Sequence, residues 1–290
     1  MSKMFDGLRK APGAVPDLDL AALVGVGAID TPTPEPPEET GTPLPEPAAA
    51  PLSTAASPHR TVSLRLPRNS PALPFDGDQW VVNEQYRILR TKLVQHPGQP
   101  RMILISSTGP ADGKSITAIN LAGVLSLKSE ANVLLLDSDF RRSSIHNHLG
   151  TPKTPGLAEV LSGACALDDA IVAAAELPKL FILPAGKPEG NPAELLDSSR
   201  WTAVVAALRA QFKYIIVDSP PFAAVADYDL LQMAGDGVLL VVRPDQSNRD
   251  LCKKALETIP KEKLIGVVMN CVPQFFLTRQ YGYGYGYGYY

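Results

Sequence analysis

Residues 107–123, STGPADGKSITAINLAG, form a glycine-containing loop that leads into a segment with helical periodicity. The run before it, RMILISS (101–107), is short and apolar, as is typical of a buried strand. Positions 108–115, TGPADGKS, match the phosphate-loop pattern G-x-x-x-x-G-K-[ST], except that Thr108 stands at the first glycine position. A loop of this kind between a strand and a helix predicts a nucleotide-binding α/β fold.

The chemistry of such a loop follows from its backbone. Successive N–H groups surround an anion, and the following helix directs its positive end at the same charge. Lys114 would reach the outer phosphates, Ser115 would ligate Mg²⁺, and Gly113 allows the backbone to approach closely. The alternative is a glycine turn that opens a helix, with Lys114 on the surface. We expect these residues to contact the nucleotide: Thr108, Gly109, Pro110, Ala111, Asp112, Gly113, Lys114, Ser115 and Ile116.

Further short apolar runs alternate with segments of helical periodicity. Strands are expected at 101–107, 132–137, 180–185, 214–219, 237–242 and 264–270. Helices are expected at 80–95, 115–129, 199–211, 226–234 and 248–259. This order predicts a P-loop NTPase-like α/β fold, with a mostly parallel sheet covered by helices on both faces.

Acidic residues follow two of the expected strands. Asp137 and Asp139 lie two residues apart in VLLLDSDFRR, and Asp218 ends YIIVDSPP. Because the carboxyl ends of parallel strands share one edge of a sheet, these carboxylates should lie beside the phosphate loop. A Mg-nucleotide role is the favoured interpretation, and simple capping of the next turn is the alternative.

Composition divides the chain into three parts. Half of the 28 prolines fall in residues 1–74, so residues 1–78 are expected to form a disordered, Pro-rich arm. Residues 79–272 would form the catalytic domain, and 273–290 a flexible tail. Within the arm, residues 1–11 carry apolar positions at helical spacing, which fits a short amphipathic docking helix or, equally, a frayed terminus.

The overall composition excludes several classes of protein. A net charge of -3 gives no basic excess, so nucleic acid is not an expected partner. No apolar run approaches the roughly 20 residues that cross a bilayer, and no signal peptide is recognisable, which predicts a cytoplasmic protein. The 3 cysteines are far apart and suit neither a metal site nor a disulfide framework.

The chain ends in a tyrosine-rich repeat, YGYGYGYGYY (281–290). A low-complexity contact segment and a set of hydroxyls for modification both fit this composition. The candidate phosphoacceptors are Tyr281, Tyr283, Tyr285, Tyr287, Tyr289 and Tyr290.

Taken together, these motifs resemble the bacterial tyrosine kinases (BY-kinases), autokinases of capsule and exopolysaccharide biosynthesis. Residues 108–115 are similar to that family's Walker A motif, LLLDSDFRR (134–142) to its Walker A′ and IIVDSPP (215–221) to its Walker B. The segments GLAEVLSG (156–163) and LPAGKPEGNPAELLDSSR (183–200) match its connecting regions. The helix EQYRILR (84–90) fits the family's E-x-x-R-x-x-R oligomerisation motif, and the resemblance covers about residues 80–290.

The resemblance implies an ATP- and Mg²⁺-dependent protein-tyrosine autokinase. Its implied catalytic residues are Lys114, Asp137, Asp139 and Arg141, with Asp137 as the base. Ser115, Asp139 and Asp218 would hold the metal, and Asn270 is a weaker candidate for contacting adenine. The division of roles between Asp137 and Asp139 stays open.

The family pattern also implies partners. Glu84, Arg87 and Arg90 would join subunits into a ring in which each tail is phosphorylated in trans; a local Glu84–Arg87 ion pair is the alternative. A membrane polysaccharide co-polymerase would activate the kinase and recruit it to the inner face of the cell membrane. Residues 1–12 would assist that recruitment, and deleting them should then weaken it.

Two rival functions belong to other classes. One is a positioning or partition ATPase, but those proteins carry a signature lysine near the start of the loop, where this chain has Gly109. The other is a nucleotide-binding scaffold with a tyrosine-rich interaction tail. Departures from the kinase pattern are mild: Ala111 and Asp112 replace Gly and Glu, and Ser143 replaces a proline.

Overall fold

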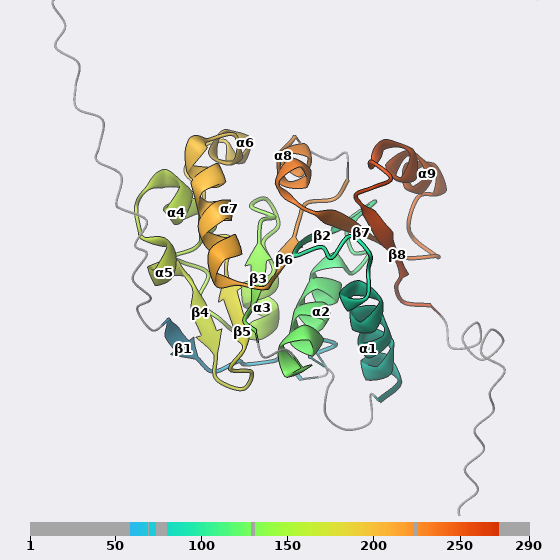
Figure 1. The fold of residues 1–290 in the computed structure, drawn as a ribbon, viewed down its shortest axis with the longest axis horizontal. Coiled ribbons are helices and arrows are strands. Elements are labelled where there is room, and N and C mark those ends of the chain that lie inside the picture. Colours follow the sequence, from blue (N-terminus) through green and yellow to red (C-terminus); the bar gives the residue numbers. More distant parts are fainter. Residues whose placement is uncertain (1–58, 69, 74–79, 129–130, 223–225, 273–290) are drawn as a thin grey trace, which may run out of the picture. The chain divides into compact units, whose positions relative to one another are not determined.

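Strands that run mostly in parallel make up a single sheet with helices on both faces (Figure 1). The computed structural model describes residues 59–68, 70–73, 80–128, 131–222 and 226–272. Within these residues the sheet has 8 strands in the order β1-β4-β5-β3-β6-β2-β7-β8. The strands are β1 Arg60–Val62, β2 Met102–Ser107, β3 Val133–Asp137, β4 Val172–Ala174, β5 Leu180–Leu183, β6 Tyr214–Asp218, β7 Gly237–Val242 and β8 Leu264–Met269.

Helices connect the strands along the chain. They are α1 Trp80–Val94, α2 Lys114–Lys128, α3 Ile145–Leu149, α4 Leu157–Ser162, α5 Leu167–Ala170, α6 Pro192–Leu196, α7 Ser199–Gln211, α8 Asp227–Ala234 and α9 Arg249–Thr258. The pairings are parallel except that β4 and β5 are antiparallel. No helix in the described part of the chain combines the length and apolarity that a membrane crossing requires.

Alternate residues of the central strands fill two separate apolar cores. On β2, Met102 and Leu104 pack with α7 and α8, whereas Ile103 and Ile105 pack with α2. All four side chains are buried, because both faces of the strand are covered. The predicted strands and helices are therefore confirmed, with boundaries within two residues of those expected.

The expected disordered arm is wrong for residues 59–68 and 70–73. β1 pairs in parallel with β4, and the backbone N–H of Arg65 donates to the Leu149 carbonyl at 2.8 Å. Ala72 is buried, and the Leu73 N–H donates to Asn120 Oδ1 at 2.6 Å. This stretch is ordered because its backbone pairs with β4 and because a few of its apolar side chains pack into the core. The proposed amphipathic helix at 1–11 lies outside the described residues.

A polar cluster at the surface ties the amino ends of β2 and β7 together. Asp236 Oδ2 accepts the backbone N–H groups of Arg101 at 2.9 Å and Met102 at 2.8 Å. Arg209, from α7, pairs with both oxygens of the same carboxylate, at 3.0 and 2.7 Å. One side chain thus joins three elements.

Asp236→Ala is expected to lower the free energy of unfolding by about 1–3 kcal/mol, because it leaves two backbone donors and a guanidinium without their acceptor. Urea denaturation measures this loss. Glu257→Ala removes an exposed carboxylate 3.9 Å from Lys253 and should cost less than about 0.5 kcal/mol. Equal losses in the two variants would contradict the structural role of Asp236.

The same carboxylate predicts a pH dependence. Burial opposes its charge, but the bonds from Arg209, Met102 and Arg101 prevail and lower the pKa of Asp236 below its ordinary value. Its contribution is therefore present above the ordinary carboxyl pKa and is lost as pH falls through the lower folded-state pKa. The stability difference between the wild type and Asp236→Ala should narrow in acid.

Candidate active site

The carboxyl ends of β2, β3 and β6 form the edge of the sheet that carries the candidate site. β2 and β3 both pair in parallel with β6, and Asp137 stands directly opposite Asp218 in the β3–β6 register. The phosphate loop leaves the end of β2 and enters α2 at Lys114. The topology thus places the loop and both strand-end carboxylates together, as the sequence predicts.

Lys114 lies between two carboxylates. Its Nζ is 2.8 Å from Asp139 Oδ2 and 3.2 Å from Asp218 Oδ1, and both aspartates are buried. Burial alone would lower the pKa of Lys114, but Asp218 and Asp139 raise it above its ordinary value. The lysine is therefore held charged within the site rather than on the surface.

Burial also raises the pKa values of two aspartates in the site. Desolvation raises the pKa of Asp218, against the opposing charge of Lys114. Desolvation, followed by the neighbouring Asp218, raises the pKa of Asp137 to about 7. Burial and the charge of Asp218 on the adjacent strand therefore both disfavour ionisation of Asp137.

A cavity of about 300 Å³ opens beside Lys114. It includes four residues that the sequence reasoning missed: Arg142, Ser144, His148 and Pro221. Three of these come from the turn after β3 and from the short helix α3, whose segment SSIHNHLG carries no apolar periodicity to reveal it. The expected residues that line it are Pro110, Ala111, Gly113, Lys114, Ser115, Ile116 and Asp139.

The donor set suits a magnesium ion accompanied by phosphates. Mg²⁺ usually takes one or two carboxylates and completes its shell with water and phosphate oxygens. Asp218 Oδ2 is buried without a hydrogen-bond partner among the described residues, and Asp139 and Ser115 border the cavity. The described residues contain no cluster of three or more His, Cys, Asp or Glu that would bind a metal by itself. The residues present therefore fit a metal that arrives with a nucleotide.

Asp112 braces the phosphate loop from within. Its buried Oδ2 accepts the Gly109 N–H at 2.9 Å and the Thr108 hydroxyl at 3.2 Å, and its Oδ1 accepts from Ser247 at 2.8 Å. The side chain thus points into the loop and away from the cavity. Ser247, in the connection from β7 to α9, gives no sequence signal for this role because an isolated serine in a polar loop is ordinary.

Asn270 supports the loop from the other side. Its Nδ2 donates to the Asp112 carbonyl at 3.0 Å, and its Oδ1 accepts the Cys271 N–H at 2.9 Å. The side chain therefore caps a turn and holds the loop at the same time. Contact with adenine stays a prediction.

Gly113→Ala is expected to weaken ADP binding at least about tenfold. Gly113 has a φ of +94°, and a Cβ there would clash with the Asn270 amide, so the loop would have to shift. Isothermal titration calorimetry measures the affinity. Gly190→Ala is the matched control, since its φ of +95° carries similar strain but nothing lies within 4 Å of the new methyl group. Similar ADP affinities in the two variants would contradict this account.

Two other predicted catalytic residues occupy different settings. Asp137 Oδ2 accepts the N–H groups of Ser144 and Ile145 at 3.2 and 3.3 Å, behind the cavity rather than on its wall. Arg141 is half exposed, and its Nε lies 3.2 Å from Asp227 Oδ2 at the start of α8. The structure therefore brings Asp139 to the cavity, and it pairs Arg141 with a carboxylate that the sequence did not single out.

The predicted oligomerisation residues lie on α1. Glu84 and Arg87 form an exposed ion pair at 3.4 Å, the local pairing considered from the sequence. Arg90 turns toward α2, where its Nη1 donates to the Val124 carbonyl at 3.4 Å. The six candidate phosphoacceptor tyrosines lie outside the described residues.

Curated proteins of known class match most of the chain. Tyrosine-protein kinase YwqD of Bacillus subtilis is 36% identical over 193 residues, 65% of this chain and 80% of that protein. Tyrosine-protein kinase CpsD of Streptococcus agalactiae is 32% identical over 199 residues, 67% of this chain and 84% of CpsD. Tyrosine-protein kinase ptk of Acinetobacter johnsonii is 33% identical over 181 residues, 62% of this chain but only 24% of ptk. No protein-family profile matches the sequence.

Solved structures share the fold. The chimerical protein CapA2B2 superposes with a TM-score of 0.65 at 28% identity, covering 74% of this chain and 94% of the other. The kinase domain of the Escherichia coli tyrosine kinase ETK has a TM-score of 0.59 at 25% identity, covering 71% and 80%. The cell division ATPase MinD of Pyrococcus furiosus has a TM-score of 0.50 at 26% identity, covering 58% and 71%.

The fold is therefore shared with tyrosine kinase domains and with a cell division ATPase, and architecture alone does not separate the rival functions. Sequence identity does separate them, because the tyrosine-protein kinases YwqD and CpsD are 36% and 32% identical to this chain over most of their own length. This chain belongs to the bacterial tyrosine-protein kinases.

Proposed function

We propose that this tyrosine kinase transfers phosphate from ATP to the tyrosines of its own C-terminal tail, in trans between the subunits of a ring. The observation that carries the proposal is Lys114 beside two buried aspartates, in a chain that ends with six closely spaced tyrosines. By the family resemblance, the phosphorylated state would regulate polymerisation and export of a capsule or exopolysaccharide.

Few residues would bind the nucleotide and its metal. The backbone of 109–115 would hold the phosphates, Lys114 would offset charge on the transferring group, and Ser115, Asp139 and Asp218 would hold Mg²⁺. Bound Mg²⁺ would neutralise phosphate charge. Lys114 currently neutralises the same two carboxylates, so it would exchange partners when a nucleotide binds.

The acceptor tyrosine needs help to attack, because a free phenol has a pKa near 10. By the resemblance, Asp137 is the residue that would take its proton. Arg141, half exposed at the same edge of the sheet, would orient the acceptor tyrosine or the phosphate once released from Asp227.

The surface of α1 supports a contact between subunits. Val81 and Ile88 are 40% and 41% exposed, and they lie on the helix that carries the Glu84–Arg87 pair. Apolar side chains beside charged ones are typical of protein interfaces, where arginine is enriched. Head-to-tail contacts between identical subunits close into a ring when the rotation from one subunit to the next closes on itself.

The length of the tail permits transfer between neighbours. Residues 273–290 would reach on the order of 60 Å when extended at roughly 3.3–3.6 Å per residue. Each phosphate adds about -1.5 to -2 charges, so six would add roughly -9 to -12. Repulsion between phosphorylated tails would then loosen the ring without refolding the catalytic domain.

The kinase would act in the cytoplasm beside a membrane polysaccharide co-polymerase that activates it. The ptk match covers a fraction of a longer tyrosine kinase, whereas YwqD is matched over most of its length. By the resemblance, the Pro-rich arm would assist recruitment to the membrane.

One assay tests the proposed function. Purified protein is incubated with ATP and Mg²⁺, and phosphorylated residues are mapped by mass spectrometry, beside Lys114→Met as the inactive control. We expect phosphate on residues 281–290 in the wild type alone. The assay is repeated with the cytoplasmic part of the activator, and ATP hydrolysis without phosphotyrosine under both conditions would overturn the proposal.

A second experiment tests transfer in trans. A chain ending at residue 272 serves as the donor, and full-length Lys114→Met serves as the acceptor. Phosphate on the acceptor tail is expected, because the donor has no tail and the acceptor lacks the loop lysine. A wild type that phosphorylates its tail while this mixture does not would show transfer within one chain.

A further inference from the structure

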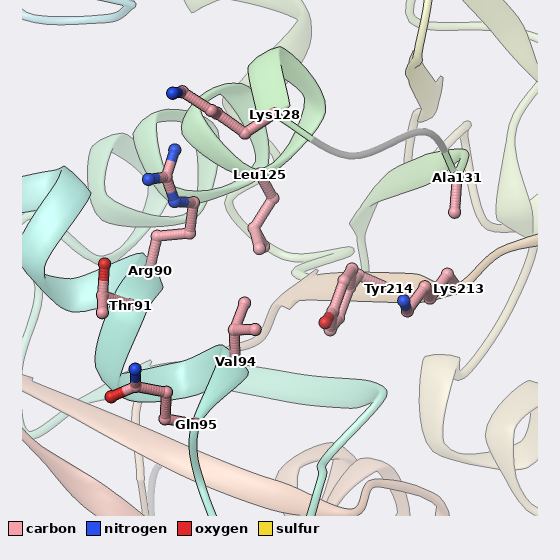
Figure 2. Close-up of a pocket in the computed structure, with 9 residues that line it drawn as sticks. All are labelled: Arg90, Thr91, Val94, Gln95, Leu125, Lys128, Ala131, Lys213 and Tyr214. Carbon is pink, nitrogen blue, oxygen red and sulfur yellow. The ribbon is translucent and has the colours of Figure 1, made fainter.

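A pocket of about 460 Å³ lies at the edge of the sheet opposite the phosphate loop (Figure 2). It is formed by the ends of α1 and α2 and by the starts of β3 and β6, that is, at the amino ends of the strands. α2 runs from the phosphate loop to this pocket, about 22 Å at 1.5 Å per residue. The pocket is thus separate from the candidate active site.

Three cations from three elements line the pocket. Figure 2 shows Arg90 of α1 and Lys128 of α2 on one side and Lys213, next to β6, on the other. No acidic residue is among the described lining residues, and no described carboxylate pairs with Lys128 or Lys213. The pocket therefore has the charge of an anion site, and a dianion would neutralise it better than a single charge.

The walls of the pocket are largely apolar. Val94, Leu125 and Ala131 contribute aliphatic surface, and the Tyr214 ring projects from the β6 side toward α1. The Lys213 ammonium lies 5.7 Å from the centre of that ring. A ligand that suits this lining combines a flat apolar body with a doubly charged end, which is the chemistry of an aryl phosphate.

We propose that this pocket binds phosphotyrosine from the kinase's own tail, as a product-recognition site. The inference rests on the proposed function, since that reaction makes the ligand. The occupant follows from charge complementarity: six tyrosines modified to dianions would be the densest anionic segment of the chain, against three lysine and arginine side chains. A nucleotide is the weaker candidate, because this pocket has no glycine-rich loop to surround a phosphate chain.

The proposed site has a consequence for assembly. Arg90 belongs both to the pocket and to the predicted oligomerisation motif. A phosphorylated tail bound there would compete with the subunit contact for the same guanidinium. The phosphorylated tail, which is the product of the kinase reaction, would then favour dissociation of the ring.

The test measures peptide binding to full-length Lys114→Met protein, which cannot phosphorylate its own tail, in saturating ADP at fixed ionic strength. The probe is a fluorescent peptide of residues 281–290 with phosphate on Tyr283 and Tyr285, followed by anisotropy. We expect binding at least tenfold tighter than that of the unphosphorylated peptide. The double substitution Lys128→Ala, Lys213→Ala should weaken it at least tenfold.

The matched control is Lys253→Ala, Lys261→Ala, which removes two exposed lysines away from the pocket and should change affinity less than twofold. Lys128→Arg, Lys213→Arg should retain binding, which separates lost charge from lost folding. An equal loss of peptide affinity in the pocket double variant and in the control double variant would overturn the proposed site. Displacement of the peptide by inorganic phosphate at an equal concentration would overturn recognition of the aryl group. The peptide is synthetic, so the binding measurement does not depend on kinase activity. If the kinase assay shows no phosphate on the tail, that result counts against the proposed function and not against the pocket.

Discussion

Lys114→Met should reduce tail phosphorylation by about 100- to 1,000-fold, the cost of removing a preorganised electrostatic contact from a reacting centre. Lys114 is the cation nearest both Asp139 and Asp218, and its Nζ borders the cavity that suits a nucleotide. The initial rate of phosphotyrosine formation at saturating ATP measures the loss. Asp236→Ala, at the opposite edge of the sheet, should leave that rate within about twofold at a temperature where the variant is folded. An active Lys114→Met protein would contradict the assigned role.

The same substitution should also destabilise the protein in magnesium-free buffer. Removing one partner of a buried ion pair costs about 3–5 kcal/mol, because the remaining charge is left uncompensated. Burial already raises the pKa of Asp218 and of Asp137, so the carboxyl groups will take up protons and the loss should shrink as pH falls.

Urea denaturation at neutral and at acidic pH measures both effects. The double variant Lys114→Met, Asp218→Asn should recover part of the lost stability, since it removes one of the two uncompensated charges. A single variant as stable as the wild type at neutral pH would show that the lysine does not hold the folded site together.

Replacing all six tail tyrosines with phenylalanine should remove nearly all phosphate incorporation, whereas single replacements should remove no more than their own share. Glycine between the tyrosines lets each phenol adopt many backbone conformations, so no single neighbour context is favoured. Intact-mass spectrometry counts phosphates per chain. Tyr228→Phe makes the same chemical change at a buried tyrosine outside the tail and should leave the count unchanged. A single tyrosine whose loss abolishes incorporation would contradict this equivalence.

The sheet and the phosphate loop could be predicted because each depends on a short, contiguous stretch of sequence. Apolar runs of five or six residues specify strands that are buried on both faces, and 214–219 and 237–242 were recovered almost residue for residue. Placing Asp137 and Asp218 at one edge of the sheet needed only the rule that parallel strands end at a common edge. That the two stand directly opposite each other is known from the structure alone. The Lys114 contacts follow from that placement.

Other features depend on contacts between distant residues, and no sequence pattern encodes those. The sequence predicts a backbone contact of Asp112 with phosphate but no role for its side chain, which accepts a hydrogen bond from Ser247, 135 positions away. The Arg141–Asp227 pair spans 86 positions. The sequence predicts a disordered arm that includes β1, because its few residues are surrounded by prolines, and only pairing with β4 makes it a strand.

The Asn270–Asp112 hydrogen bond has a mechanical meaning. β8 ends at Met269, Asn270 holds the phosphate loop, and the tail begins three residues later. The residue that holds the loop is thus only three positions before the segment that we propose is phosphorylated. If a neighbouring subunit pulled on that segment, the tension would reach the phosphate loop through the amide group of Asn270.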